Sequence, residues 1–142
     1  MNIDNKMKIT FPSYSKNESF ARSVVSCFSL ALNPSVAEIN DIKTAVSEAV
    51  TNAIVHGYPD TVGDITIEAQ LIGREIHINV IDNGVGIGNL KEALEPFYTT
   101  KPEEERSGMG FTIMQSFMDS IKVESIKGQG TKVYMLKTIK AS

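Results

Sequence analysis

Length, composition and charge narrow the class of protein before any motif is considered. The chain has 142 residues, 42% of them hydrophobic, so we expect a single domain over residues 1–142 that buries a substantial core. A net charge of −3 gives no sign of a nucleic-acid-binding face, and a single cysteine excludes an internal disulfide framework. The sequence has no apolar run long enough to cross a membrane and no apolar signal core in residues 1–8, which predicts a cytoplasmic protein.

The first half of the chain predicts one strand and the beginnings of two helices. Residues 6–14 alternate weakly and contain a proline, a combination typical of an edge strand. Ser15 stands three residues before Glu18, and Ser35 stands three residues before Glu38. This is the spacing of a capping box, in which the serine and glutamate side chains each bond a backbone amide at a helix N-terminus. We therefore expect a helix to begin at each serine.

Apolar residues at helical spacing predict the buried faces of these two helices. Cys27 lies one position from the first face, and we expect its thiol to be buried. Gly57, with a proline two residues later, is expected to end the second helix. The residues expected to face the core are Phe20, Val24, Phe28 and Leu32 in the first helix and Ile39, Ile42, Val46, Ala49 and Ala53 in the second.

Alternation in the second half predicts the architecture of the sheet. Residues 65–71 and 76–80 alternate between apolar and polar side chains around a short turn at Gly73, a pattern typical of a β-hairpin. Each strand has one wet face, which favours an α+β fold: a two-layer α/β sandwich with a mixed, largely antiparallel sheet and helices on one face. The other segments expected are a long loop over residues 84–110 with a short helix near 90–94, a helix over 111–120, and strands over 122–126 and 131–137.

Polar residues on the second predicted helix could carry chemistry. Glu48 and Asn52 are four residues apart, so they project from one face of the helix, and His56 continues the line. A carboxylate and an amide oxygen one turn apart suit a general base and a ligand for a hard cation such as Mg²⁺. The alternative is a solvated stripe with a weak contact between the two side chains. His56 is expected to have a structural role.

Three further segments are rich in glycine. Residues 82–86 (Asp-Asn-Gly-Val-Gly) follow a predicted strand, where the carboxylate could accept a hydrogen bond from an exocyclic amine and Gly86 would allow close approach to a flat ring. Residues 107–110 (Ser-Gly-Met-Gly) precede a predicted helix, whose N-terminal amides could bind phosphate with help from Arg106. Residues 128–131 favour a hairpin turn. Each segment taken alone is also explained by an ordinary turn or connection.

In this order and at these separations, the four motifs resemble those of the ATPase superfamily that includes gyrase, Hsp90, histidine kinases and MutL. The counterparts are an N box (residues 48–57), two glycine boxes (82–86 and 108–110) and a Gly-Thr pair (130–131). This resemblance implies a Bergerat-type ATP-binding fold with a long lid over the ATP.

A narrower resemblance covers nearly the whole chain. Residues 18–22, 47–57, 99–102 and 105–114 are similar to the sporulation anti-sigma-F family of small bacterial anti-sigma factors and serine kinases. Asn83 departs from this pattern, since an acidic residue is expected there. The position lies beside the adenine site rather than at the phosphates, so nucleotide binding is still expected.

The resemblance implies a role for each motif residue. Asp82 would bind the adenine amine, with Gly86 beside the ring and Thr131 supporting the contact through water. Asn52 would bind Mg²⁺ at the phosphates of ATP or ADP. Glu48 would be the general base toward an incoming serine hydroxyl. Arg106 would neutralise charge at the γ-phosphate, and the remaining phosphate contacts would come from Ser107, Gly108, Met109 and Gly110.

The resemblance also implies partners. The chain would be a protein serine/threonine kinase that phosphorylates a separate anti-anti-sigma factor and that binds and inhibits a sporulation sigma factor (sigma-F), with Arg22 at a partner-contacting position. A homodimer in the bacterial cytoplasm, in the forespore, is expected on the same ground, with no direct contact to nucleic acid or membrane. Two alternatives stay open: a stress-response-type anti-sigma serine kinase with a different sigma partner, and a nucleotide-gated binding module without phosphotransfer.

Overall fold

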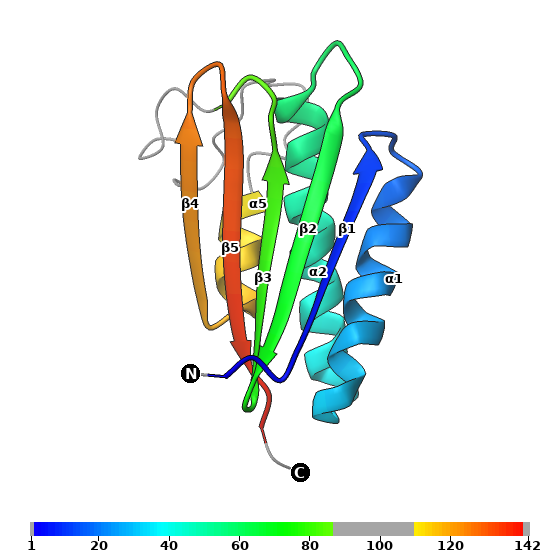
Figure 1. Cartoon of the computed structure of the whole chain (residues 1–142), viewed down its shortest axis with the longest axis vertical. Coiled ribbons are helices and arrows are strands. Elements are labelled where there is room, and N and C mark those ends of the chain that lie inside the picture. Colours follow the sequence, from blue (N-terminus) through cyan, green and yellow to red (C-terminus); the bar gives the residue numbers. More distant parts are fainter. Residues whose placement is uncertain (1, 87–109, 141–142) are drawn as a thin grey trace.

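The computed structural model describes residues 2–86 and 110–140, which form one sheet with helices packed on one of its faces (Figure 1). The strand order is β1-β2-β3-β5-β4, and every pairing between the described strands is antiparallel. The expected two-layer α+β sandwich is therefore confirmed. The sheet was expected to be mixed, but the described strands include no parallel pair. The strands are β1 (Asn5–Pro12), β2 (Asp64–Ile72), β3 (Glu75–Asp82), β4 (Ser120–Ile126) and β5 (Gly130–Thr138). The helices are α1 (Asn17–Ser29), the 3₁₀ turn η1 (Leu30–Leu32), α2 (Val36–Asn52), the π-helix η2 (Ala53–Gly57) and α5 (Gly110–Phe117).

The core lies between the sheet and the helix layer. Alternate residues of the β2–β3 hairpin point into it, as their pattern predicts, and α2 covers them from the other side. Burying one such aliphatic side chain contributes about 1.5–3 kcal/mol, so this alternation decides which face of the hairpin is covered. The central buried residues are Ile65, Ile67, Ala69, Leu71, Ile76, Ile78 and Val80 from the hairpin and Ile42, Val46, Ala49 and Val50 from α2.

The first helix differs from its sequence pattern at its start. It begins at Asn17 after Lys16, and none of the described side chains caps its N-terminus, so the capping box expected at Ser15 is wrong. The carboxylate of Glu18 has other partners: one oxygen accepts a hydrogen bond from Arg22 (3.2 Å) and the other from Thr51 on α2 (3.3 Å). A tertiary contact has therefore taken the side chain that the local pattern assigned to the cap.

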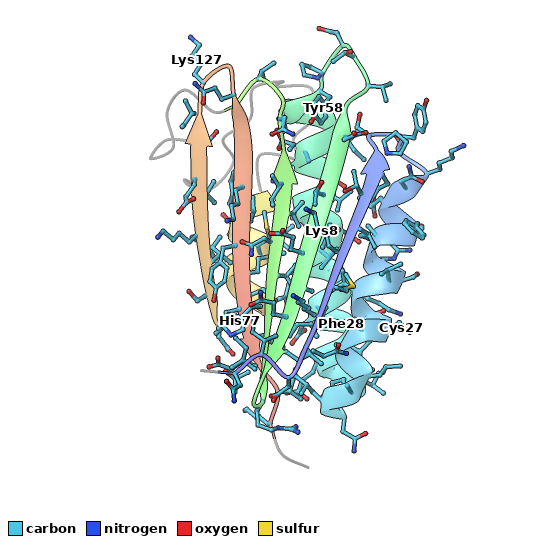
Figure 2. All side chains as sticks on the ribbon, viewed as in Figure 1. Lys8, Cys27, Phe28, Tyr58, His77 and Lys127 are labelled. Carbon is cyan, nitrogen blue, oxygen red and sulfur yellow. The ribbon has the colours of Figure 1, made fainter. Side chains whose placement is uncertain are left out.

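The buried face of this first helical segment was predicted only in part: Leu32 is buried and Phe28 packs against the core, as expected. Small residues face the core, namely Ala21, Val25, Ser26 and Ser29, whereas Phe20 is 49% exposed. The Phe20 ring instead lies edge-on to the Phe11 ring, with 6.1 Å between ring centroids. Small side chains allow α1 to pack closely on α2, which places the larger ones at the margin. Cys27, expected to be buried, is exposed on α1 (Figure 2).

The second helix follows its pattern closely. Its capping box is formed, because Glu38 N–H donates to Ser35 Oγ (3.1 Å) and Ser35 N–H donates to Glu38 Oε1 (2.9 Å). Of the residues expected to face the core, only Ile39 is half-buried rather than buried. The helix continues beyond Asn52 as a π-helix that ends at Gly57, the residue expected to end it.

The third helix is shorter than expected. It ends at Phe117, and Ser120, expected to be its last residue, begins β4 instead. Asp119 explains the early end, because its N–H donates to the Leu136 carbonyl (2.9 Å) and its carboxylate accepts from Thr138 N–H (2.6 Å). These bonds attach the chain to β5. Most of the loop expected over residues 84–110 lies outside the described residues, because the structure does not describe 87–109. The short helix expected near 90–94 falls within that range.

Candidate functional site

One end of the molecule brings together the ends of η2 and β3 and the turn between β4 and β5 (top of Figure 1). Backbone hydrogen bonds fix this arrangement: Val85 N–H donates to the Gly57 carbonyl (2.9 Å), and Gly128 N–H donates to the Val85 carbonyl (2.6 Å). Asp82 and Thr131 are paired in the ladder between β3 and β5. Three of the four predicted motifs, far apart in sequence, therefore meet at one end of the fold.

Asp82 ends β3 with a buried carboxylate, and only 6% of the residue is exposed. Gly84 N–H donates to its Oδ1 over 2.9 Å. A Cβ at Gly57 would lie 2.9 Å from the Asp82 carboxyl carbon, so this glycine leaves the room that the carboxylate occupies. Burial raises the pKa of the Asp82 carboxyl above its ordinary value, although backbone hydrogen bonds oppose the shift. A carboxylate held so tightly suits recognition of a hydrogen-bond donor on a ligand.

Gly86 and Gly130 have backbone conformations that favour glycine. Gly86 has φ +74°, and a Cβ there would lie 2.3 Å from the Ile126 carbonyl oxygen. Gly130 has φ +120°, and a Cβ there would lie 2.1 Å from the Asp82 carbonyl oxygen. Both glycines are required where the β4–β5 turn packs against the end of β3. The close approach of Gly86 to a ligand ring stays a prediction.

Glu48 and Asn52 lie one turn apart near the end of α2. Glu48 is 5% exposed, which is unusual for a carboxylate and excludes the solvated stripe as its explanation. Both the Nδ2 and the Oδ1 atoms of Asn52 are buried without a hydrogen-bond partner among the described residues. Buried polar atoms normally find a partner, so this amide has hydrogen-bonding capacity that the described residues leave unused. His56 belongs to the π-helix, whose wider turn changes the regular spacing after Asn52.

Tyr58 was missed by sequence reasoning. Its hydroxyl donates to the Asp64 carbonyl (2.7 Å) and accepts from Asn83 N–H (2.8 Å), directly beside Asp82. Burial raises the pKa of the Tyr58 hydroxyl, so it stays protonated and can donate. Figure 2 shows Tyr58 at this end of the molecule. Tyr58 lies just past the expected helix end, and no local pattern links it to position 83.

Ser125 was missed for a similar reason. Its Oγ lies 2.7 Å from the Thr131 Oγ1 and donates to the Gly130 carbonyl (3.0 Å), so it fixes the hydroxyl that was expected to support the adenine contact. The one signal in the sequence is strand alternation, which places position 125 on the inner face of β4.

Arg22 lies on α1, a different element from those that meet at this end. Its guanidinium donates to Glu18 (3.2 Å) and to Ser19 (3.4 Å), and 40% of its side chain is exposed. The phosphate-side residues Arg106, Ser107, Gly108 and Met109 lie outside the described residues. Gly110 is described and begins α5, which packs against α2.

A family model and curated relatives match most of the chain. The histidine kinase-like ATPase domain family matches residues 11–137. Anti-sigma F factors from Clostridium acetobutylicum, a Thermoanaerobacter species and Clostridium perfringens are 56%, 55% and 58% identical. The matches cover 95%, 98% and 95% of this chain and 94%, 97% and 97% of those proteins. The chain belongs to the anti-sigma F factor family.

Solved structures show the same fold. The RsbU and RsbW domains of a Mycobacterium tuberculosis protein match with a TM-score of 0.72 at 20% identity, over 97% of this chain and 33% of that chain. The catalytic domain of the histidine kinase ThkA matches with a TM-score of 0.60 at 16% identity, over 94% and 96% of the two chains. As a member of the anti-sigma F factor family with a kinase-like ATPase domain, the chain is a nucleotide-using protein of the kinase-like class.

Two kinds of feature are absent from residues 2–86 and 110–140. None of the helices there combines the length and the apolarity that a membrane span needs. No group of three or more histidine, cysteine or acidic residues is placed there to ligate a metal ion.

Proposed function

We propose that this chain binds ATP with Mg²⁺, phosphorylates an anti-anti-sigma factor on serine, and binds and inhibits a sporulation sigma factor of the sigma-F type. The observation that carries the proposal is the buried amide of Asn52, without a partner among the described residues, one turn from the buried Glu48. The names of the relatives support the sigma factor as partner. A bacterial cytoplasmic location in the forespore and a homodimer are part of the same proposal.

Asp82 would select adenine. Its carboxylate can accept a hydrogen bond from the exocyclic amine, and its position is fixed by Gly84 N–H and by the packing of Gly57. The ionised carboxylate is the stronger acceptor, so protonation of Asp82, whose pKa is raised by burial, should weaken nucleotide binding. Thr131, whose Oγ1 lies 2.7 Å from Ser125 Oγ, would support the same contact through water.

Asn52 would bind the cation. An amide oxygen is a suitable ligand for Mg²⁺, and the burial of Asn52 Oδ1 without a partner among the described residues fits that use. When bound, Mg²⁺ supplies positive charge at the phosphates. Gly110 begins α5 and would contribute a backbone donor to a phosphate, together with Ser107, Gly108 and Met109. Arg106 would neutralise charge that develops on the γ-phosphate.

Glu48 would act as the general base. In the transfer step the serine oxygen of the partner protein forms a bond to the γ-phosphorus, and the bond between that phosphorus and the β–γ bridging oxygen breaks to release ADP. The proton of the serine hydroxyl passes to the Glu48 carboxylate. The position of Glu48, buried one turn from Asn52, supports this role, because a general base must lie within hydrogen-bond reach of the hydroxyl that it deprotonates.

Transfer of label from γ-labelled ATP to an anti-anti-sigma factor tests the proposal. Glu48→Gln is expected to lower the transfer rate by about 10²–10⁴-fold, the usual contribution of a general base, while Mg²⁺-ATP still binds. Asn52→Ala is expected to weaken Mg²⁺-ATP binding in calorimetry. Glu38→Gln is the matched control, because Glu38 is at the opposite end of the same helix and glutamine also serves in a capping box.

The outcomes separate the alternatives. If the Glu48→Gln variant transferred label at the rate of the unmodified protein, Glu48 would not be the general base. Sigma binding that depends on ATP, without any transfer by the unmodified protein, would favour a nucleotide-gated binding module. Transfer to an anti-anti-sigma factor of a stress-response pathway, and not to one of sporulation, would favour the other kinase type.

A further inference from the structure

We propose that Tyr58 is a positioning residue for nucleotide selectivity: its hydroxyl holds the backbone at Asn83 so that the Asp82 carboxylate meets the amino group of adenine. This role rests on the proposed function, in which Asp82 binds that amine. In this role Tyr58 acts through its bonds to backbone and makes no contact with the nucleotide itself.

The contacts of Tyr58 form a bridge between two segments. Its hydroxyl donates to the Asp64 carbonyl at the start of β2 (2.7 Å) and accepts from Asn83 N–H just past the end of β3 (2.8 Å). Asp82 is the residue before Asn83, and the next amide, Gly84 N–H, donates to its Oδ1. The hydroxyl and the carboxylate therefore hold two successive amides of one short segment.

The ring of Tyr58 is held as firmly as its hydroxyl. Tyr58 is 9% exposed, and a Cβ at Gly63 would lie 2.2 Å from the Tyr58 Cε1, so only a glycine leaves room for the ring. Gly63 is fixed in turn, because Ser13 N–H donates to its carbonyl (2.8 Å) and its own N–H donates to Ser13 Oγ (3.1 Å). The bridge is thus anchored to β1 as well as to β2.

A rigid hydrogen-bond acceptor matters most where one ligand presents a donor and the other presents an acceptor at the same position. Adenine presents an amino donor, whereas hypoxanthine presents a carbonyl oxygen that an ionised Asp82 would repel. Selectivity between them depends on the carboxylate remaining in place, since a loosened carboxylate loses the bond to the donor and avoids the acceptor. Loss of the Tyr58 hydroxyl should therefore reduce the difference between the two affinities.

Tyr58→Phe tests this role, because it retains the ring that packs on Gly63 and removes only the hydroxyl. The Kd values of ATP and inosine triphosphate are measured by competition with a fluorescent ATP analogue. We expect the ATP Kd to rise about threefold to tenfold, the range for loss of one neutral hydrogen bond, and the inosine triphosphate Kd to change by less than about twofold. The kcat for phosphotransfer at saturating ATP should stay near that of the unmodified protein while KM for ATP rises.

Tyr134→Phe is the matched control. Tyr134 also has a hydrogen-bonded hydroxyl, at 2.7 Å from His77 Nδ1, and burial raises its pKa as well. His77 lies at the other end of the sheet from Tyr58 (Figure 2). We expect Tyr134→Phe to leave both nucleotide affinities unchanged.

Several results would overturn the role of Tyr58. One is unchanged selectivity in a folded Tyr58→Phe protein, and another is an equal loss of affinity for both nucleotides. Hydrogen exchange of the Asn83 amide adds a test that needs no folded variant: in the unmodified protein this amide must exchange slowly, and exchange at the rate of a free amide would contradict the bridge. If the unmodified protein binds no ATP, the proposed function fails instead.

Discussion

At the scale of single residues, Asp82 combines a functional advantage with a cost to stability. Burial raises the pKa of its carboxyl above the ordinary value, so the folded state disfavours the charged form. A group with a raised folded-state pKa stabilises the fold below its unfolded pKa, and that contribution is lost as the pH rises through the folded-state pKa. At neutral pH, the ionised Asp82 therefore weakens the fold, and the same charge is what the proposed contact with an adenine amine would use.

Asp82→Asn should reverse both effects. We expect the melting temperature at pH 7.5 to be equal to or higher than that of the unmodified protein, and ATP affinity to fall by about tenfold or more, as for loss of a charged hydrogen bond. Any gain in melting temperature should shrink as the pH falls towards the pKa of Asp82. Thermal unfolding at several pH values and calorimetry with ATP measure the two effects.

Asp60→Asn is the control for this comparison, because Asp60 is an exposed aspartate that follows Gly57 closely in the sequence. It should change neither the melting temperature nor ATP affinity. An Asp82→Asn protein that is less stable at every pH would show that the bond from Gly84 outweighs the cost of burial.

At the scale of elements, two identical local patterns have different outcomes. Ser35 and Glu38 form the capping box that their spacing predicts, whereas Ser15 and Glu18 do not, because Glu18 bonds Arg22 and Thr51. The sequence pattern alone cannot separate these cases, since the competing partner Thr51 is more than thirty residues away along the chain. Local signals thus predicted α2 and the β2–β3 hairpin well and failed where a distant side chain competed.

This difference predicts unequal effects of the same substitution. Ser35→Ala should lower the free energy of unfolding by about 1 kcal/mol, the usual cost of losing a serine N-cap. Ser15→Ala should change it by less than about 0.5 kcal/mol, because the exposed Ser15 side chain caps no helix. Urea unfolding of the two variants measures both values. Equal losses would mean that Ser15 does cap α1 in solution.

At the scale of the whole molecule, motif order predicted which segments form the site but not how they are held together. Asp82, Glu48 and Asn52 were found from their spacing, since each belongs to a regular element whose period fixes its direction. Tyr58 and Ser125 were not, because their roles depend on hydrogen bonds to backbone that is distant in sequence. Residues proposed to contact a ligand are therefore easier to find in this sequence than the residues that hold them in place.

The same scale separates the proposed partner surface from the nucleotide site. Arg22 lies on α1, and its ion-pair partner Glu18 also accepts a bond from Thr51, the neighbour of Asn52 on α2. Arg22→Glu should weaken binding of the sigma factor or the anti-anti-sigma factor by about tenfold or more, the effect of reversing a charge at an interface. ATP affinity should be retained, because the described partners of Arg22 are Glu18 and Ser19, which are not residues of the proposed nucleotide site.

Lys8→Glu provides the matched charge reversal for Arg22→Glu. Lys8 is an exposed cation that also lies near a glutamate, with 4.0 Å between its Nζ and Glu68, but it is on β1, on the face of the sheet that the helices leave uncovered. Equilibrium binding of both variants to each partner, together with ATP calorimetry, distinguishes the possibilities. Equal weakening by both reversals would show a general effect of net charge, and loss of ATP binding by Arg22→Glu would show damage to the α1–α2 packing. Only a selective loss of partner binding at Arg22 places the partner surface on α1.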